Sequence, residues 1–423
     1  MSGTKITELY KNALNSYNEH KYEESLNLIN QVLKQDPNFQ DAQARKGQIL
    51  YALGKYGDSI ESLNKSLEID NFNSWNWRFK ALSLWKLGEL PEAIRCFDQA
   101  LKIDPDYYNA LIEKGNIMFE IKNLDEASKL YELAMKKNQD LPYAWHNIAL
   151  VYKIEKQNEQ ALKSFRTALE KHNNVDDNYS KAETLYELGK LYMVSGEINN
   201  TKTFLEKAIV TCNELLKHDE NNYEITLLLG DCLREIGNYN SAESSYNKIL
   251  ERSPDDFEVL LRLVYLYAEF MIDRQKSMKI NLRMVNLNKD SIVTKIDLLE
   301  DYVCLDQYEN AINLGKELLT QVIKPKFECI IRLYVLFSNL LRINSLDYEM
   351  IEQFIEYYKN LDPAQVIDNN VWHFTGFLNT ISKKGINDDL LFIIRELINL
   401  ISGKLDDKEE TTLLYHKIME YKV

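Results

Sequence analysis

The chain has 423 residues, of which 45% are hydrophobic and 27% charged, and its formal net charge at pH 7 is −14. Nucleic-acid-binding proteins usually carry a basic patch or stripe, and neither the net charge nor any run of Lys and Arg provides one, so a nucleic-acid partner is disfavoured. No apolar run is long enough to span a membrane, and the first residues lack the apolar core of a signal peptide. The composition indicates a folded protein that uses neither kind of partner.

The cysteines indicate the compartment. There are five, an odd number, and no two of them form a CxxC pair; they stand at positions 96, 212, 232, 304 and 329. Buried free thiols in a reducing cytoplasm explain this pattern better than disulfides do. We therefore expect a cytoplasmic protein.

Small residues recur along the first part of the chain at a constant interval. One row consists of Ala13, Gly47, Ala81, Gly115 and Ala149. A second row consists of Ser25, Ser59, Ala93, Ala127 and Ala161, and a third, looser row of Val32, Ser66, Ala100, Ala134 and Ala168. Self-similarity at a fixed period of about 20–50 residues, the range in which this interval lies, is typical of stacked repeats rather than of one globular core.

Each period reads as two helices joined by a turn. In the third period, Ala81 lies on the expected first helix, Gly88 at its end, and Ala93 with Phe97 on the second helix. Glycine tolerates the left-handed conformation that is common just after a helix. Pro105 then stops the second helix. The small residues predict close contact between the paired helices.

This pattern resembles the tetratricopeptide repeat (TPR), a helix–turn–helix of about 34 residues. The resemblance is carried by Trp77, Trp145, Gly47, Gly115, Tyr152, Ala93, Ala127, Ala161, Phe97, Phe165, Ala100, Ala134, Ala168, Pro37 and Pro105. It implies an all-α protein, a right-handed α-solenoid of helix–turn–helix repeats, with a degenerate helical region at the C-terminal end.

We expect four domains or regions along the chain. Residues 1–175 contain five regular repeats, at 6–39, 40–73, 74–107, 108–141 and 142–175. Residues 176–256 contain two further repeats, with a polar loop inserted at Asn173 to Ser180 and a second helix lengthened over Ala208 to His218. Residues 257–363 are expected to form degenerate helical hairpins, near 291–324 and with helices near 327–342 and 348–360 before Pro363. Residues 364–423 are expected to be C-terminal capping helices, near 369–382, 387–402 and 408–421.

The motifs of common enzymes are missing. Six histidines form no HExxH and no metal-ligand spacing with cysteines, and the chain has no phosphate loop, no strand–GxGxxG–helix unit and no GxSxG elbow. We predict that the protein is not an enzyme and has no cofactor and no metal. An enzyme in the C-terminal region, near Trp372 and His373, is the least favoured alternative.

The resemblance also implies a binding surface. In TPR proteins the first helices of successive repeats line a concave face where peptides commonly bind. The residues carried over to this groove are Arg45, Tyr51, Trp75, Arg78, Phe79, Trp85, Asn109, Asn116, Phe119, Tyr143, His146 and Asn147. Aromatic residues and Arg dominate interface energetics, although any one of these aromatic side chains could equally fill the protein interior.

The sign of charge changes along this expected groove. Repeats two to five have Arg45, Arg78, Lys86 and Lys153 against Asp41, Glu113 and Glu120. Repeats six and seven have Glu183, Glu187, Glu224, Asp231 and Glu235 against Lys190 and Arg234. We hypothesise that an extended partner places an anionic portion over the former repeats and a basic portion over the latter.

The sequence therefore predicts a scaffold or adaptor that binds a protein or peptide of unknown identity. Chaperone-binding relatives hold a C-terminal carboxylate with five residues, of which only Asn116 and Asn147 are matched here; Ile112, Glu183 and Glu187 stand at basic positions. A co-chaperone-like binder without a complete clamp is one alternative. A self-associating structural protein that uses its C-terminal helices is another, so homo-oligomerisation stays open.

Overall fold

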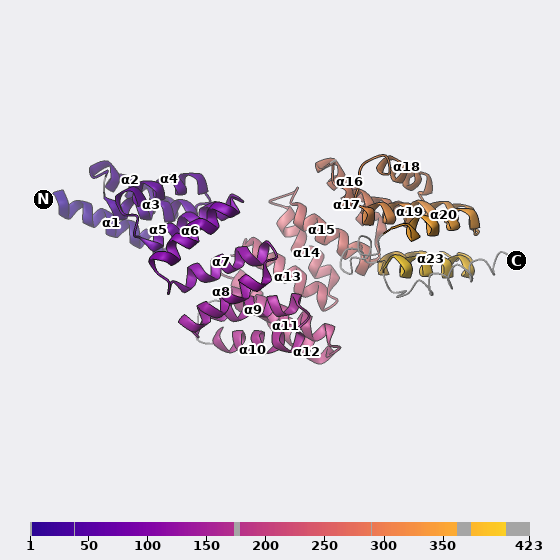
Figure 1. The fold of residues 1–423 in the computed structure, drawn as a ribbon, viewed down its shortest axis with the longest axis horizontal. Helices are drawn as coiled ribbons and strands as arrows, with labels where there is room; N and C mark the ends of the chain where they lie inside the picture. Colours follow the sequence, from indigo (N-terminus) through magenta and orange to yellow (C-terminus); the bar gives the residue numbers. More distant parts are fainter. Residues whose placement is uncertain (1, 38, 173–177, 289, 362–373, 403–423) are drawn as a thin grey trace. The chain divides into compact units, whose positions relative to one another are not determined.

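The structure is a computed structural model that describes residues 2–37, 39–172, 178–288, 290–361 and 374–402. Within these ranges all regular structure is helical and there is no strand (Figure 1). The chain divides into two compact units, Met1–Thr211 (unit 1) and Cys212–Val423 (unit 2). The predicted all-α class and the helical-repeat architecture are confirmed.

Unit 1 begins with five helix–turn–helix pairs. They are α1 (Ser2–Asn18) with α2 (Tyr22–Gln35), α3 (Gln40–Ala52) with α4 (Tyr56–Ile69), α5 (Ser74–Lys86) with α6 (Leu90–Ile103), α7 (Tyr108–Glu120) with α8 (Leu124–Lys137), and α9 (Pro142–Ile154) with α10 (Asn158–His172). The first helices of pairs two to five start at positions 40, 74, 108 and 142, so their spacing is constant and equals the interval between the small residues in the sequence.

The turn between the paired helices recurs with the same period. It has one residue with positive φ in each pair, and these residues are His20, Gly54, Gly88, Lys122 and Lys156. Only two of the five are glycine, although a side chain in this region is strained. The backbone geometry of the repeat is therefore imposed by the packing of the two helices and not by glycine alone.

In that packing, a small residue on the first helix faces a large residue on the second helix, which we call the small-to-large packing rule. A Cβ added to Gly47 would lie 2.5 Å from Cγ of Leu63, and one added to Gly115 would lie 2.6 Å from Cε1 of Tyr131. In both cases the large residue follows the glycine by sixteen positions, on the second helix. The hydroxyl of Ser59 also donates a 2.7 Å hydrogen bond to the carbonyl oxygen of Gly47, so the buried serine of this repeat is satisfied.

Unit 1 continues with α11 (Asn178–Val194) and α12 (Ile198–Leu216), whose last residues belong to unit 2. The predicted polar loop is wrong at its C-terminal end, because Asn178 to Ser180 are already helical; residues 173–177 lie outside the described residues. The second helix is longer than those of the regular repeats, but it ends at Leu216, two residues before the predicted end at His218. Helix α12 has 19 residues, whereas α6 and α8 have 14 each.

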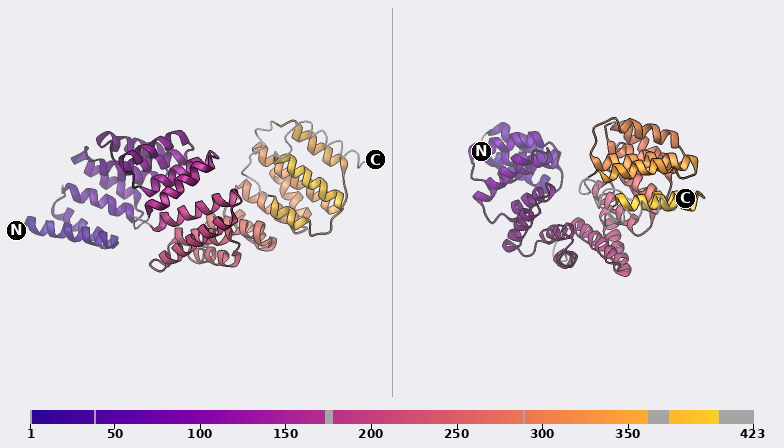
Figure 2. Two further views of the ribbon diagram at one scale, coloured as in Figure 1. Left: turned by 90° about the horizontal axis from the view of Figure 1, so that it is seen from below. Right: turned by 45° about the vertical axis from the view of Figure 1, so that its right-hand side comes forward.

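The helices of unit 2 within the described residues are α13 (Tyr223–Glu235), α14 (Tyr239–Leu250), α15 (Phe257–Tyr265), α16 (Arg274–Leu287), α17 (Ile292–Cys304), α18 (Tyr308–Leu318), α19 (Pro325–Ile343), α20 (Tyr348–Lys359), α22 (Thr375–Ile381) and α23 (Asp388–Ile401). Helices α20 and α23 both pack against α19 (Figure 2). Helices α17 to α20 occur where hairpins were expected. Pro363 and the stretches 369–373 and 408–421 lie outside the described residues.

One element of unit 2 was not predicted. A π-helix of six residues, η1 (Leu266–Met271), continues α15, and it ends at Ile272, which has φ of 54°. π-helical turns are rare and occur frequently at functional sites. This segment separates α15 from α16.

Candidate functional site

The first helices of unit 1 share one face. Side chains on this face contact the next first helix at a separation of one repeat. The pairs Arg78–Glu113 and Trp85–Glu120 are each 35 residues apart, and Tyr143 hydrogen-bonds Asn109 over 34 residues. We call this the groove face. All twelve residues predicted for the groove come from the helices that form it, α3, α5, α7 and α9.

An aromatic cluster forms the part of the groove face on α3 and α5. The rings of Trp75 and Phe79 lie 4.3 Å apart between centroids, and Tyr51 meets Phe79 edge-on at 5.8 Å. The guanidinium of Arg45 lies 5.1 Å from the centre of the Trp75 ring. Phe79 is only 8% exposed, so it belongs to the core beneath the groove face. Trp75 and Tyr51 are half-buried and remain accessible on that face.

Two of the four cations predicted to meet a partner, Arg78 and Lys153, form ion pairs within the protein. Nε of Arg78 donates to Glu113 at 2.7 Å, and a second nitrogen of the same guanidinium pairs with the other carboxylate oxygen. Burial works against the charge of Arg78, but the hydrogen bonds and charge of Glu113 outweigh it and raise the pKa of Arg78. Nζ of Lys153 also pairs with Oε2 of Glu187. Arg78 and Lys153 therefore each have an internal anion, and the change of charge sign along the groove stays a prediction.

Other predicted residues also have partners. Nε1 of Trp85 donates to Oε2 of Glu120 at 2.7 Å, and the ammonium of Lys122 lies 5.7 Å from the ring centre of Phe119. Both aromatic residues are half-buried. They stand near the C-terminal ends of α5 and α7, at the edge of the groove face.

The centre of the groove face is a cavity of about 470 Å³. It is lined by α7, α9 and the start of α11, with Asn109, Ile112, Glu113, Asn116, Tyr143, His146, Asn147, Leu150, Ser180 and Glu183. The structure thus brings five of the predicted residues, Asn109, Asn116, Tyr143, His146 and Asn147, into one place.

The amides of this cavity form a partly satisfied network. Oδ1 of Asn116 accepts from Nδ2 of Asn147 at 2.7 Å and from the hydroxyl of Tyr131 at 2.9 Å. Oδ1 of Asn109 accepts from the Tyr143 hydroxyl at 3.2 Å. No hydrogen bond within the described residues uses Nδ2 of Asn116, Nδ2 of Asn109 or Oδ1 of Asn147. The cavity therefore offers both donors and acceptors to a ligand.

His146 lies in the wall of this cavity but is almost completely buried, with 7% of its surface exposed. Its Nδ1 is 2.9 Å from Oγ1 of Thr184, and its ring meets Phe165 at 5.3 Å. Burial lowers the pKa of His146 from 6.5 to about 4. The imidazole is neutral at physiological pH and supports the groove wall more than it contacts a partner.

This shift predicts a pH dependence of stability in unit 1. Between pH 6.5 and 4 the unfolded chain binds a proton at His146 and the native state does not, so stability falls as the pH falls. We expect the titration of His146 to lower the free energy of unfolding at pH 5 by about 2 kcal/mol relative to pH 8. The variant His146→Gln should lose less stability between these pH values than the wild type does.

The measurement is urea unfolding followed by tryptophan fluorescence at pH 5 and pH 8. Four of the five tryptophans, Trp75, Trp77, Trp85 and Trp145, lie in unit 1, and Trp372 is replaced by Phe in every protein compared. The control for the loss of a histidine is the exposed His218 changed to Gln. Equal pH dependence in His146→Gln and the wild type would show that His146 is not the titrating group.

Metal sites and membrane spans each need a particular arrangement of side chains. Among the described residues, no group of three His, Cys, Asp or Glu side chains is placed to hold a metal ion. No helix in the described ranges is both long and apolar enough to cross a bilayer. All five cysteines are buried and none forms a disulfide, which confirms the prediction of buried thiols.

Comparisons with known proteins agree with this architecture. Tetratricopeptide-repeat family models match residues 10–74, residues 84–150 with 204–264, and residues 142–170. Tetratricopeptide repeat protein 21A of Mus musculus is 30% identical over 114 residues, which are 26% of this chain and 8% of that protein. The chain thus matches only a small part of that relative's length.

Similar solved structures include a tetratricopeptide repeat protein from Parabacteroides merdae, with 16% identity and a TM-score of 0.46; the match covers 62% of this chain and 98% of that one. PilW, a type IV pilus biogenesis factor, has 18% identity and a TM-score of 0.43, over 53% of this chain and 98% of its own. The recurring helix pairs define a helical-repeat protein. This chain belongs to the tetratricopeptide-repeat family.

Sequence reasoning missed the internal partners on the groove face. Glu113 and Glu187 were assigned to the surface, and the hydroxyl of Tyr131 was not connected with Asn116. The signal was present, since Arg78 and Glu113, like Lys153 and Glu187, are opposite charges one repeat apart. First helices of neighbouring repeats lie side by side, so such pairs should be expected to meet.

Proposed function

We propose that this protein is a non-enzymatic scaffold that holds an extended segment of a partner protein on the groove face of unit 1. TPR proteins are in general protein-interaction scaffolds, and this chain has their repeats. The observation that supports the position of the segment is the amide-lined cavity of α7, α9 and α11. An extended backbone carries alternating N–H and C=O groups, and these match the unused donors and acceptors of Asn109, Asn116 and Asn147.

The neighbouring aromatic cluster supplies the apolar contact for the same segment. Trp75 and Tyr51 are half-buried, so a partner side chain can cover their remaining surface at little cost in side-chain entropy. The paired ions Arg78–Glu113 and Lys153–Glu187 hold neighbouring first helices together. We therefore assign specificity to amides and aromatic rings, and we assign these ion pairs to the framework.

The experiment is affinity capture from native lysate with mass spectrometry. The variant Asn109→Leu/Asn147→Leu removes two amides of the cavity and keeps the side chains close to their original size. A matched control is Gln99→Leu, an exposed amide on the second helix α6. We expect the partner to be captured by the wild type and the control and to be lost, or captured at least tenfold less, by the double variant.

The design avoids residues that would confuse the result. Changing Phe79 would create a cavity in the core, and changing Arg78 to Glu would leave Glu113 unpaired beside a second carboxylate. Equal capture by all three proteins would place the binding surface outside the groove face. Recovery of only the chain itself would favour the self-associating alternative.

A further inference from the structure

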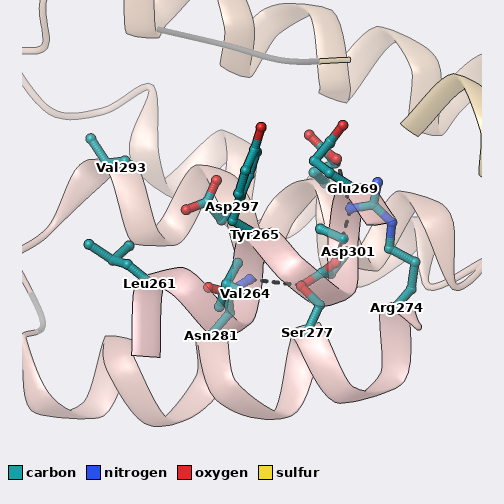
Figure 3. Close-up of a pocket in the computed structure, with 12 residues that line it drawn as sticks. Leu261, Val264, Tyr265, Glu269, Arg274, Ser277, Asn281, Val293, Asp297 and Asp301 are labelled. Atoms are coloured by element: carbon teal, nitrogen blue, oxygen red, sulfur yellow. Dashed lines mark hydrogen bonds and ion pairs between the residues drawn. The ribbon is translucent and has the colours of Figure 1, made fainter. Parts of the chain in front are cut away.

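Unit 2 contains a second cavity, of about 230 Å³, between α15, η1, α16 and α17 (Figure 3). Three half-exposed apolar or aromatic side chains belong to its lining, Leu261, Tyr265 and Val293, which are 38%, 38% and 41% exposed. Acidic groups gather deeper in the same cavity. An apolar entrance above an acidic interior is a shape that the groove face of unit 1 does not have.

The cavity contains four carboxylates and one cation. The acidic residues are Glu269 on η1 and Asp297, Glu300 and Asp301 on α17, and the cation is Arg274 on α16. Nη1 of Arg274 lies 2.8 Å from Oε1 of Glu300 and 3.3 Å from Oδ1 of Asp301. One guanidinium cannot neutralise four carboxylates, so the ionised cavity carries an excess of negative charge.

Two of the polar groups in this lining are poorly satisfied. Asp297 makes no hydrogen bond or ion pair within the described residues, and its carboxylate oxygens are free of dashed contacts in Figure 3. Asn281 is completely buried; its Nδ2 donates to Asp301 at 2.8 Å, but its Oδ1 has no partner in the part of the chain that is described. A buried acceptor without a donor is costly, so Oδ1 of Asn281, together with the partly exposed carboxylate of Asp297, points to a ligand that donates hydrogen bonds.

The pKa values of the carboxyl groups agree with an excess of negative charge in the cavity. Burial, together with the neighbouring Glu300 and Asp301, raises the pKa of Asp297 well above its usual range. Burial also raises the pKa of Glu269 and of Asp301 to about 7. Arg274 counteracts these shifts only in part. The Nε and Nη2 atoms of Arg274 also lack partners among the described residues, so the site has donors too, but the net charge selects a cation.

The size and chemistry of the cavity narrow the choice of cation. No group of His, Cys, Asp or Glu among the described residues has the arrangement of a metal site. Pockets for drug-sized ligands have volumes of about 300–1,000 Å³. At about 230 Å³ the cavity suits one long side chain or a small amine. Leu261, Val264 and Val293 offer an apolar surface to the methylene stem of such a group, which prefers apolar contact behind its charged head.

We propose that this cavity receives the side chain of one lysine or arginine from a partner protein, with its charged head at Asp297 and Asn281 and its stem against Leu261 and Val293. This site is separate from the groove face of unit 1 and does not depend on peptide binding there. It provides a second contact with a partner protein, in which one basic side chain is recognised.

The test is a titration of the full-length protein, labelled with ¹³C in its Val and Leu methyl groups, with three small probes. Nα-acetyl-lysine methylamide represents the partner side chain, cadaverine represents a free diamine, and Nα-acetyl-norleucine methylamide is the neutral counterpart of the lysine probe. We expect the lysine probe to shift the Val264 and Val293 methyl signals with saturation. We expect the norleucine probe to bind at least tenfold more weakly and cadaverine to bind no better than the lysine probe.

Two variants and one control complete the experiment. Asp297→Asn removes one charge without changing the size of the side chain, and Val293→Trp obstructs the entrance while leaving every carboxylate in place. Each should weaken lysine-probe binding at least tenfold. Glu251→Gln changes an exposed carboxylate of unit 2 that does not line the cavity, and it should bind as the wild type does.

A pH signature distinguishes the proposed site from an apolar pocket. The charged groups that line the cavity are Glu269 from η1, Arg274 from α16, and Asp297, Glu300 and Asp301 from α17; α15 contributes none. Because carboxyl groups with a pKa near 7 must lose protons to attract a cation, affinity should rise about tenfold from pH 6 to pH 8. Equal binding of the norleucine probe, wild-type binding by Asp297→Asn, tighter binding of cadaverine than of the lysine probe, or no saturable shift would each overturn the proposal.

Discussion

Replacing Arg274 by methionine should destabilise unit 2 by about 3–5 kcal/mol, because it leaves buried carboxylates without their cation. Arg274 is 4% exposed and pairs with Glu300 and Asp301, of which Asp301 is completely buried. Asp301 also accepts hydrogen bonds of 2.8 Å from Ser277 and from Asn281. Loss of the guanidinium therefore disturbs a network that joins α16 to α17.

The matched control is Arg283→Met on the same helix. Arg283 pairs with Asp255, and both side chains are exposed, so this change should cost less than about 1 kcal/mol. The measurement is amide hydrogen exchange of the buried segment of α17, which should accelerate strongly in Arg274→Met and little in Arg283→Met. Similar exchange in the two variants would contradict the assigned role of the buried ion pair.

The loss in Arg274→Met should also depend on pH. The carboxyl groups of Glu269 and Asp301 have raised pKa values, so between the unfolded pKa and about 7 the native state holds more protons than the unfolded chain. Stability from these groups therefore falls as the pH rises. Without Arg274 these carboxyl groups stay protonated in the native state up to a higher pH. The destabilisation of Arg274→Met should therefore be larger at pH 8 than at pH 5.

Replacing Gly115 by valine should destabilise unit 1 by about 2–3 kcal/mol, because the new side chain would overlap the ring of Tyr131. A Cβ at this position lies 2.6 Å from Cε1 and 3.0 Å from Cδ1 of that ring. The hydroxyl of Tyr131 also donates a hydrogen bond to Asn116, the residue next to Gly115, so a shift of the ring would disturb the amide cavity. The cost should appear both in stability and in partner binding.

Gly57 provides the opposite case. It lies in the first turn of α4, and a Cβ there would meet nothing within 4 Å. Gly57→Ala should therefore stabilise unit 1 by up to about 0.5 kcal/mol through helix propensity. Urea unfolding followed by tryptophan fluorescence measures both variants, and a destabilising Gly57→Ala or a neutral Gly115→Val would contradict the small-to-large packing rule.

The repeat architecture of unit 1 could be predicted from the sequence because its cause is local and recurs. A small residue such as Gly115 and a large one such as Tyr131, sixteen positions later, define one helix pair, and helix pairs of the same kind follow at a constant spacing. The turn was predicted less well, since Lys122 and Lys156 take the positive φ that glycine has in the preceding repeats.

The candidate sites could be predicted only in part. The resemblance to the TPR family placed Asn109, Asn116, Tyr143 and Asn147 on one face, and they do line one cavity. The pairing of Arg78 with Glu113 depends on how adjacent repeats stack, which the pattern within one repeat does not describe. In unit 2 neither η1 nor the acidic cavity follows from the pattern, because the regular period has been lost there and no proline or glycine marks the π-helical turn.

The central claim is that the groove face of unit 1 contacts the partner, and site-specific photo-crosslinking tests it most directly. The photoreactive residue p-benzoylphenylalanine is placed at Tyr143, in the amide cavity, and separately at Leu133, which is exposed on the second helix α8. We predict that cross-links to one contiguous segment of a single partner form from position 143 and not from position 133. Cross-links from position 133 alone, or equal cross-linking from both positions, would contradict the claim.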